Sequence, residues 1–200
     1  EVMCGSGRCG TFFAFEQDGI KPDIVTIAKG LGGGYQPISA MLARGVIHDS
    51  IVAEQGSFSH GHTYVGHATA CAAALAVADV IVSNDLLPQV VQSGKSLRSE
   101  LQSCFSAHPY VGDIRGRGLF VGIEIVDNRS SKSPADASLG NRISAAAMQR
   151  GLMVYPGGGT ADGTNGAHIL LAPPFIYERA HLDELVSKLK LAVGDALGEH

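Results

Sequence analysis

Short apolar runs and helical stripes alternate along the chain. The β-branched run 23–28 lies between Pro22 and Gly30, which is typical of a buried strand. A second run of this kind covers 38–43. Residues 67–83 are small and apolar, without glycine or proline. We therefore expect two short strands, followed by a buried helix that packs closely against its neighbours.

The second half of the chain combines longer helical stripes with short strands. Apolar residues at close to helical spacing indicate a helix that starts at Asn84 or Asp85 and ends near Ala107. Beyond it we expect, in chain order, a turn that feeds a strand over 114–125, a polar loop over 127–136, a helix from 139 to Gly151, strands near 152–155 and 168–172, and a final helix over 178–197.

The order of these elements predicts the fold class and a domain boundary. Alternating strands and helices in the first part favour an α/β fold. The long helix near 85–107 marks a boundary, after which the pattern indicates a smaller α+β unit. We therefore predict two parts, 1–107 and 108–200. The chain opens on Glu-Val-Met-Cys without an initiator methionine, so we also expect it to begin inside a longer protein.

Composition narrows the classes of partner. Of the 200 residues, 45% are hydrophobic and 17% are charged, with a formal net charge of −4. These values give no electrostatic reason to expect binding to nucleic acid or to an anionic membrane. No apolar run reaches the roughly 18 residues of a membrane span. The four cysteines lack CxxC spacing, so we expect reduced thiols and a cytoplasmic location.

One lysine stands in a setting that suits covalent chemistry. Lys29 follows the run Thr26-Ile27-Ala28 and precedes Gly30-Leu31-Gly32-Gly33-Gly34. A lysine that forms a Schiff base must be held rigidly and must reach the neutral amine, which burial at a strand end favours. The glycines would let backbone and cofactor approach closely. A solvated surface lysine is the alternative that this pattern leaves open.

Two glycine-containing motifs suggest other ligands. Gly5, Gly7 and Gly10 form a GxGxxG after a strand-like run, which is the fingerprint of a dinucleotide site in a dehydrogenase. The residues after Gly10 do not indicate the long helix that such a site needs. Arg115 and Arg117 lie between glycines and could bind an anionic substrate, although solvated arginines in a turn are the simpler interpretation.

A histidine-rich loop offers a third possibility. His60, His62 and His67 could ligate zinc, although no Cys, Asp or Glu accompanies them. The same loop leads into a predicted helix, and helix N-termini attract anions. Thr63 and the neighbouring backbone amides could therefore hold a phosphate, so we predict no metal site.

The lysine segment, taken with its neighbours, resembles the class III aminotransferases, which are pyridoxal-phosphate enzymes of fold type I. Five segments carry this resemblance over nearly the whole chain, in the family's order. They are Glu1-Val2 with Gly5, Gly7, Arg8 and Gly10; Pro22-Asp23 with the segment from Ile27 to Gly34; His62-Thr63-Tyr64 with Gly66-His67; Arg117-Gly118-Leu119 with Gly122-Ile123-Glu124; and Leu171-Ala172-Pro173-Pro174.

The resemblance implies the C-terminal part of such an enzyme, with the remainder of a large-domain sheet followed by a small α+β domain. Lys29 is then the Schiff-base lysine, and the general acid/base that moves the substrate proton, with pyridoxal 5'-phosphate as cofactor. Thr63 is similar to the family threonine that reaches across a dimer interface to the phosphate of the neighbouring subunit's cofactor. The implied reaction transfers an amino group from an amine or omega-amino acid to a keto acid, in a homodimer with shared active sites.

The chain departs from the family pattern in several places. The family carries an Asp directly before the pair that matches Glu1-Val2, and that carboxylate pairs with the pyridine nitrogen of the cofactor. Cys9 stands where Thr is usual, Ala68 where Pro is usual, and Tyr155-Pro156 where some relatives place a substrate-carboxylate arginine. A related aminomutase, racemase or decarboxylase, or a non-catalytic fragment that self-associates, therefore remains an alternative.

Overall fold

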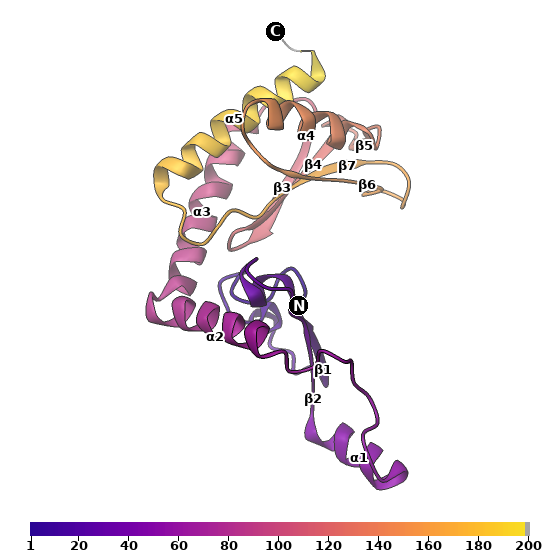
Figure 1. Ribbon diagram of the computed structural model, residues 1–200. Coiled ribbons are helices and arrows are strands. Elements are labelled where there is room, and N and C mark those ends of the chain that lie inside the picture. The colour runs from indigo at the N-terminus through magenta and orange to yellow at the C-terminus, as the bar shows by residue number, and fades with distance from the viewer. Residues whose placement is uncertain (199–200) are drawn as a thin grey trace. The chain divides into compact units, whose positions relative to one another are not determined.

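The computed structural model describes residues 1–198, which form two compact units that divide between Pro88 and Gln89 (Figure 1). This division lies earlier than our sequence boundary at residue 107. The reason is helix α3 (Leu86–Phe105), because most of its buried side chains belong to the core of the second unit. These are Val90, Leu97, Leu101 and Phe105.

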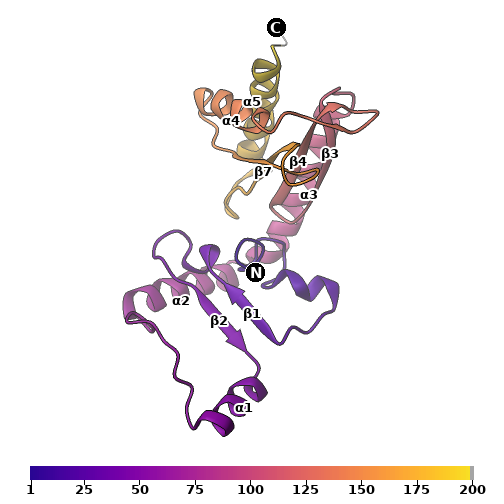
Figure 2. The ribbon, with the colours of Figure 1, turned by 90° about the vertical axis from the view of Figure 1, so that its right-hand side faces the viewer.

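The first unit is built on a two-stranded hairpin. β1 (Ile24–Ile27) pairs antiparallel with β2 (Ala40–Ala43), with Ile27 opposite Ala40. The 3₁₀ helix η2 (Lys29–Gly32) comes almost directly after β1. Figure 2 shows the two strands side by side, with α1 beyond the end of β2. Both strands fall within the runs that the sequence predicts.

The remaining elements of the first unit are helical. They are η1 (Ala14–Asp18), α1 (Gly45–Gln55) and α2 (Ala68–Ser83). The bounds of α2 match the prediction, but the expectation of a buried helix is wrong, because the described elements leave most of its surface uncovered and only Ala70 and Ile81 are buried. No single described helix is long and apolar enough to cross a membrane; α2 and α3 meet the criteria only when taken together, as a bent pair.

The second unit contains an antiparallel sheet with strand order β3-β4-β7-β6. Its strands are β3 (Val111–Arg117), β4 (Phe120–Asn128), β6 (Tyr155–Gly158) and β7 (Ala167–Leu171), and the short β5 (Ser133–Pro134) pairs with β4. Where the sequence predicts a turn that feeds a strand over 114–125, residues 111–117 already form a full strand, whose glycines hide the strand pattern, and the turn is confined to Gly118 and Leu119 before β4. β6 is an edge strand with Pro156 and two glycines.

The main core of the chain lies in this second unit. Alternate residues of β4, namely Val121, Ile123 and Ile125, are buried and join one cluster with side chains from α3, α4 (Leu139–Gln149) and α5 (Arg179–Leu197). Figure 1 shows the three helices around the strands. Full burial of each large apolar side chain stabilises the fold by about 1.5–3 kcal/mol. The buried apolar residues before Pro88 are far fewer: Cys9, Ile27, Ala70, Ile81 and Leu86.

Candidate active site at the end of strand β1

Lys29 occupies a tight turn where β1 ends. It is the first residue of η2, and its backbone lies in the left-handed region, with φ of 46°. The turn is closed by hydrogen bonds from the Leu31 amide to the Ala28 carbonyl and from the Gly33 amide to the Gly30 carbonyl, each 3.0 Å long. A left-handed residue other than glycine costs roughly 1–3 kcal/mol and persists only where its surroundings hold it. Strain of this kind is concentrated at functional sites.

Lys29 lines an open cavity of about 670 Å³. The side chain is exposed, so the expected burial at the strand end is wrong for this chain. Gln36 and Ser39 supply polar groups to the same cavity, and Pro37 and Ile38 supply apolar ones. The sequence gives no sign of these residues as site residues, because they come after the glycine run without any motif of their own.

The glycine loop before β1 is a compact turn and not a dinucleotide fingerprint. Gly10 donates to the Gly7 carbonyl at 2.9 Å, and Gly7 donates to the Phe12 carbonyl at 3.2 Å. The loop leads only into the short 3₁₀ helix η1, so the dehydrogenase alternative is wrong. The Glu1 carboxylate instead accepts hydrogen bonds from the amides of Ala14 and Phe15, at 2.9 and 3.2 Å. The Glu1 carboxylate therefore holds the backbone in place where the loop passes into η1.

Two side chains of the same loop have shifted proton affinities. Burial raises the pKa of the Cys4 thiol, which donates a 3.4 Å hydrogen bond to the Glu1 carboxylate. Cys4 is therefore held as the protonated thiol, which is a poor nucleophile. Burial also lowers the pKa of the Arg8 guanidinium from its ordinary value.

The described residues that line the Lys29 cavity include none from the histidine-rich loop. Thr63 is exposed in a turn before α2, and it does not line that cavity in the described chain. His67 caps α2 by accepting from the Ala70 amide at 3.3 Å. The rings of His60 and His62 are 5.4 Å apart, yet no group of three or more metal-ligating side chains occurs among residues 1–198. The zinc alternative therefore lacks a ligand set.

Arg115 is a strand residue with two carboxylate partners. Its Nη1 lies 2.8 Å from Asp113 and 2.7 Å from Glu124, and these hydrogen bonds raise the pKa of the guanidinium. Arg115 is exposed, as the interpretation of a solvated residue requires, but the expected place in a turn is wrong, since Arg115 belongs to β3. Because both carboxylates already neutralise this cation, an anionic substrate would have to displace them.

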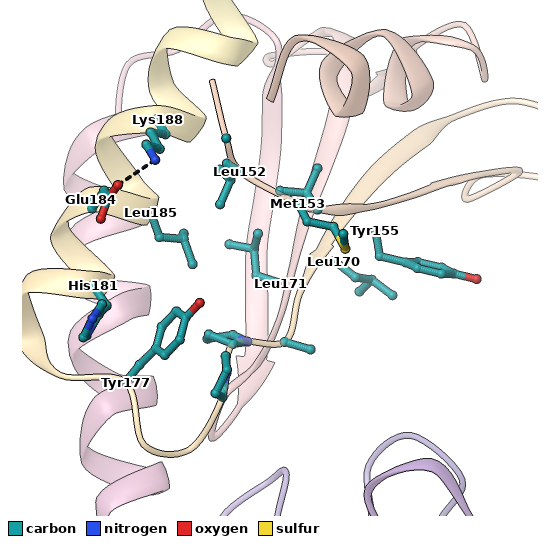
Figure 3. A pocket seen from close by; sticks show the side chains of 15 residues that line it. Leu152, Met153, Tyr155, Leu170, Leu171, Tyr177, His181, Glu184, Leu185 and Lys188 are labelled. Atoms are coloured by element: carbon teal, nitrogen blue, oxygen red, sulfur yellow. Dashed lines mark ion pairs between the residues drawn. The ribbon is translucent and has the colours of Figure 1, made fainter. Parts of the chain in front are cut away.

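A second cavity, of about 550 Å³, lies in the second unit. Figure 3 shows leucines and Met153 around it, with Tyr177 and His181 at one side and Tyr155 at the other. Its lysine, Lys188, forms an ion pair with Glu184 at 2.6 Å, and this pair lowers the pKa of the Glu184 carboxyl. A paired ammonium is a poor nucleophile, so this cavity does not compete with that of Lys29 as a covalent site.

Comparison with known proteins places the chain in a family. The model of the class-III aminotransferases matches residues 1–193. Over 195 residues the chain is 45% identical to an uncharacterised aminotransferase of Schizosaccharomyces pombe, covering 96% of this chain and 42% of that protein. It is 36% identical to gamma aminobutyrate transaminase 3, chloroplastic, of Solanum lycopersicum, covering 98% and 37%.

Solved structures agree with these relatives. A Bacillus anthracis aminotransferase superposes with a TM-score of 0.90 at 36% identity, covering 98% of this chain and 44% of its own. A thermostable (S)-enantioselective omega-transaminase from Thermomicrobium roseum gives 0.86 at 36% identity, covering 98% and 42%. The chain thus spans about two fifths of the proteins it matches. These matches confirm the predicted α/β fold class and agree with a C-terminal part. The chain belongs to the class-III aminotransferase family.

Proposed function

We propose that Lys29 is the residue that binds pyridoxal 5'-phosphate covalently, in a protein that transfers an amino group from an amine or omega-amino acid to a keto acid. The observation that carries this proposal is the position of Lys29. It directly follows Ala28 at the end of β1, in a strained and hydrogen-bonded turn, and it lines a cavity with polar groups beside it. Membership of the aminotransferase family supports the reaction class.

The residues around Lys29 fit such a cofactor. An amine on the cavity wall suits an aldehyde, and Gln36 and Ser39 offer an amide and a hydroxyl to polar substituents. Gly34 has φ of 83° and open space where a side chain would project, so nothing there obstructs a ring. When bound, the cofactor supplies the electron sink. The part of Lys29 is to hold the cofactor and to move a proton at the substrate carbon with its side-chain nitrogen.

We further propose a homodimer in which Thr63 serves the neighbouring subunit's cofactor phosphate. Thr63 is exposed and lies outside the cavity of its own Lys29, so its hydroxyl is available to a second chain. Exposed apolar side chains on nearby elements support an association surface, with Tyr64, Val65 and Leu75 at 79%, 71% and 64% exposure.

Borohydride trapping tests the assignment of Lys29. The protein is incubated with pyridoxal phosphate, reduced and digested, and the labelled peptides are identified by mass. Label on the Lys29 peptide is expected, and Lys29→Ala should abolish it. Lys21→Ala is the matched control, since Lys21 belongs to the same unit and should carry little label. Label spread equally over Lys21 and Lys29 would contradict the proposal.

Product analysis separates amino transfer from the related reactions. Turnover should require both an amine donor and a keto acid acceptor, because the amino group must leave on one substrate before the other accepts it. Turnover without an acceptor would instead favour an aminomutase, racemase or decarboxylase.

A further inference from the structure

Ser6 is an unusual residue for the place that it occupies. Only 3% of its surface is exposed, and its Oγ is buried without a hydrogen-bond partner among the described residues. Its backbone is left-handed, with φ of 54°. A buried hydroxyl without a partner costs about 1–3 kcal/mol, and the backbone conformation adds to that cost. Stability of the loop alone does not explain a serine here.

The side chain of Ser6 packs against the residue that comes after Lys29. A β-carbon built on Gly30 would lie 3.2 Å from Ser6 Cβ and 3.7 Å from Ser6 Oγ. The first of these distances is tighter than ordinary van der Waals contact, so a β-carbon on Gly30 would require Ser6 to move by a few tenths of an ångström. Ser6 and Gly30 therefore fit each other as a matched pair.

The loop that carries Ser6 is itself well held. The Gly5 amide donates to the Glu1 carbonyl at 3.0 Å, and the Arg8 amide donates to the Gly5 carbonyl at 3.4 Å. A β-carbon on Gly5 would lie 2.6 Å from that same Glu1 oxygen. Because hydrogen bonds hold the backbone on both sides of Ser6, its side chain has little freedom to move away from Gly30.

Ser6 thus packs beside the residue that follows Lys29, and both Ser6 and Lys29 have a left-handed backbone. Four residues other than glycine have such a backbone in the described chain, and Ser6 and Lys29 are two of them. We propose that Ser6 is a positioning residue for Lys29, which acts by packing against Gly30 and holding the strained turn in place. This inference rests on the proposed role of Lys29 and adds a residue from a separate loop to it.

The experiment uses the 200-residue chain and a cycle of two substitutions, Ser6→Gly and Gly30→Ala. Two readouts report on the Lys29 turn. One is hydrogen exchange at the Leu31 and Gly33 amides, measured against the amides of β1, and it needs no cofactor. The other is the ratio of borohydride-trapped pyridoxal phosphate on Lys29 to that on Lys21.

Each single substitution is expected to speed hydrogen exchange at the two turn amides by about five-fold. The ratio of pyridoxal phosphate trapped on Lys29 to that trapped on Lys21 should fall by a similar factor. Effects of this size are in the range of coupling between contacting residues. The double variant should recover most of both losses, because the new β-carbon on residue 30 fills the space that Ser6 leaves. Additive losses in the double variant, or an unchanged turn in Ser6→Gly, would overturn the inference.

Ser6→Ala separates packing from the hydroxyl. It keeps the β-carbon, so both readouts should stay within about two-fold of the unchanged chain, while thermal stability holds or rises as the unpartnered hydroxyl is removed. A loss as large as that of Ser6→Gly would refute packing as the cause. If the unchanged chain shows no preference for Lys29, the proposed function fails, and the exchange data still decide whether Ser6 holds the turn.

Discussion

Gly94, in the middle of α3, lies directly against the backbone of Gly118 in the turn between β3 and β4. A β-carbon on Gly94 would overlap the Gly118 carbonyl, and Arg98 Nη1 donates to that same carbonyl oxygen at 3.2 Å. Glycine inside a helix normally costs about 0.5–1 kcal/mol relative to alanine. The close approach of helix and hairpin explains why α3 carries glycine at this position.

The sign of the effect of Gly94→Ala tests this contact. Helix propensity alone predicts stabilisation, whereas the overlap predicts a loss of about 1–3 kcal/mol in the free energy of unfolding. Urea denaturation followed by circular dichroism measures the change. Gln102→Ala, at an exposed position of the same helix, is the control and should be nearly neutral. A gain in stability for Gly94→Ala would contradict the contact.

Arg129 joins the end of α3 to the start of β3. Its Nη1 donates to the carbonyl oxygens of Phe105 and Val111, each at 3.0 Å. Hydrogen bonds from a charged donor contribute about 1.5–3 kcal/mol each, so Arg129→Met should lower the free energy of unfolding by about 2–4 kcal/mol. The exposed Arg142, changed to Met in the same way, is the control. Equal effects of the two substitutions would show that the hydrogen bonds to the two carbonyls do not contribute measurably to the free energy of unfolding.

The Asp113–Arg115 pair predicts an acid-dependent contribution to stability. The hydrogen bond from Arg115 is the main cause that holds the pKa of Asp113 below its ordinary value of 3.8. A lowered pKa stabilises the folded state above that value, and the contribution is lost as the pH falls through the folded-state pKa. Because both side chains are about half exposed, we expect less than about 1 kcal/mol.

The measurement compares the free energy of unfolding of the unchanged chain and of Arg115→Gln across acid pH. Their difference should be constant near neutrality and should shrink between about pH 5 and about pH 2, as Asp113 becomes protonated. A difference that grows on acidification would mean that the sign of the interaction is wrong.

Mixed dimers test the shared site in the protein. Lys29→Ala removes the proposed covalent residue of one subunit, and Thr63→Ala removes the proposed phosphate contact to the other. In a mixed dimer of these two variants, the subunit that keeps Lys29 would face an intact Thr63 from its neighbour, so one complete site is restored. Cofactor retained after dialysis, at about half the level of the unchanged dimer, is the expected result. The dimer of Thr63→Ala alone should lose its cofactor. No recovery in the mixed dimer would assign Thr63 to its own subunit's site, and full retention by the Thr63→Ala dimer would show that Thr63 serves neither site.

Much of the secondary structure can be predicted from apolar periodicity. The bounds of β1, α2 and α5 follow directly from it, since each has a clear run or stripe. Helix α1 cannot be predicted in this way, because Gly45–Gln55 has no apolar stripe and buries no residue. The pattern of β3 resembles a turn in part, because glycines interrupt it at positions 112 and 116.

The candidate site is only partly visible in the sequence. Lys29 stands out because its glycine neighbours form a motif, but Ser6 comes from a different loop and becomes its neighbour only through the fold. The exposure of α2 and of Lys29 cannot be predicted either. Composition shows that a segment is suited to burial, whereas the packing of other elements decides whether it is buried.

The edge of the second sheet has a consequence for how the protein behaves in concentrated solution. An exposed strand offers unpaired amides and carbonyls to any other extended chain, and this is a common route to templated growth of aggregates. β6 ends the sheet with Tyr155, Pro156 and two glycines. Proline has no amide hydrogen to offer, and glycine weakens a strand. This edge of the sheet is therefore a poor template for further strands, so growth by strand addition at β6 is disfavoured.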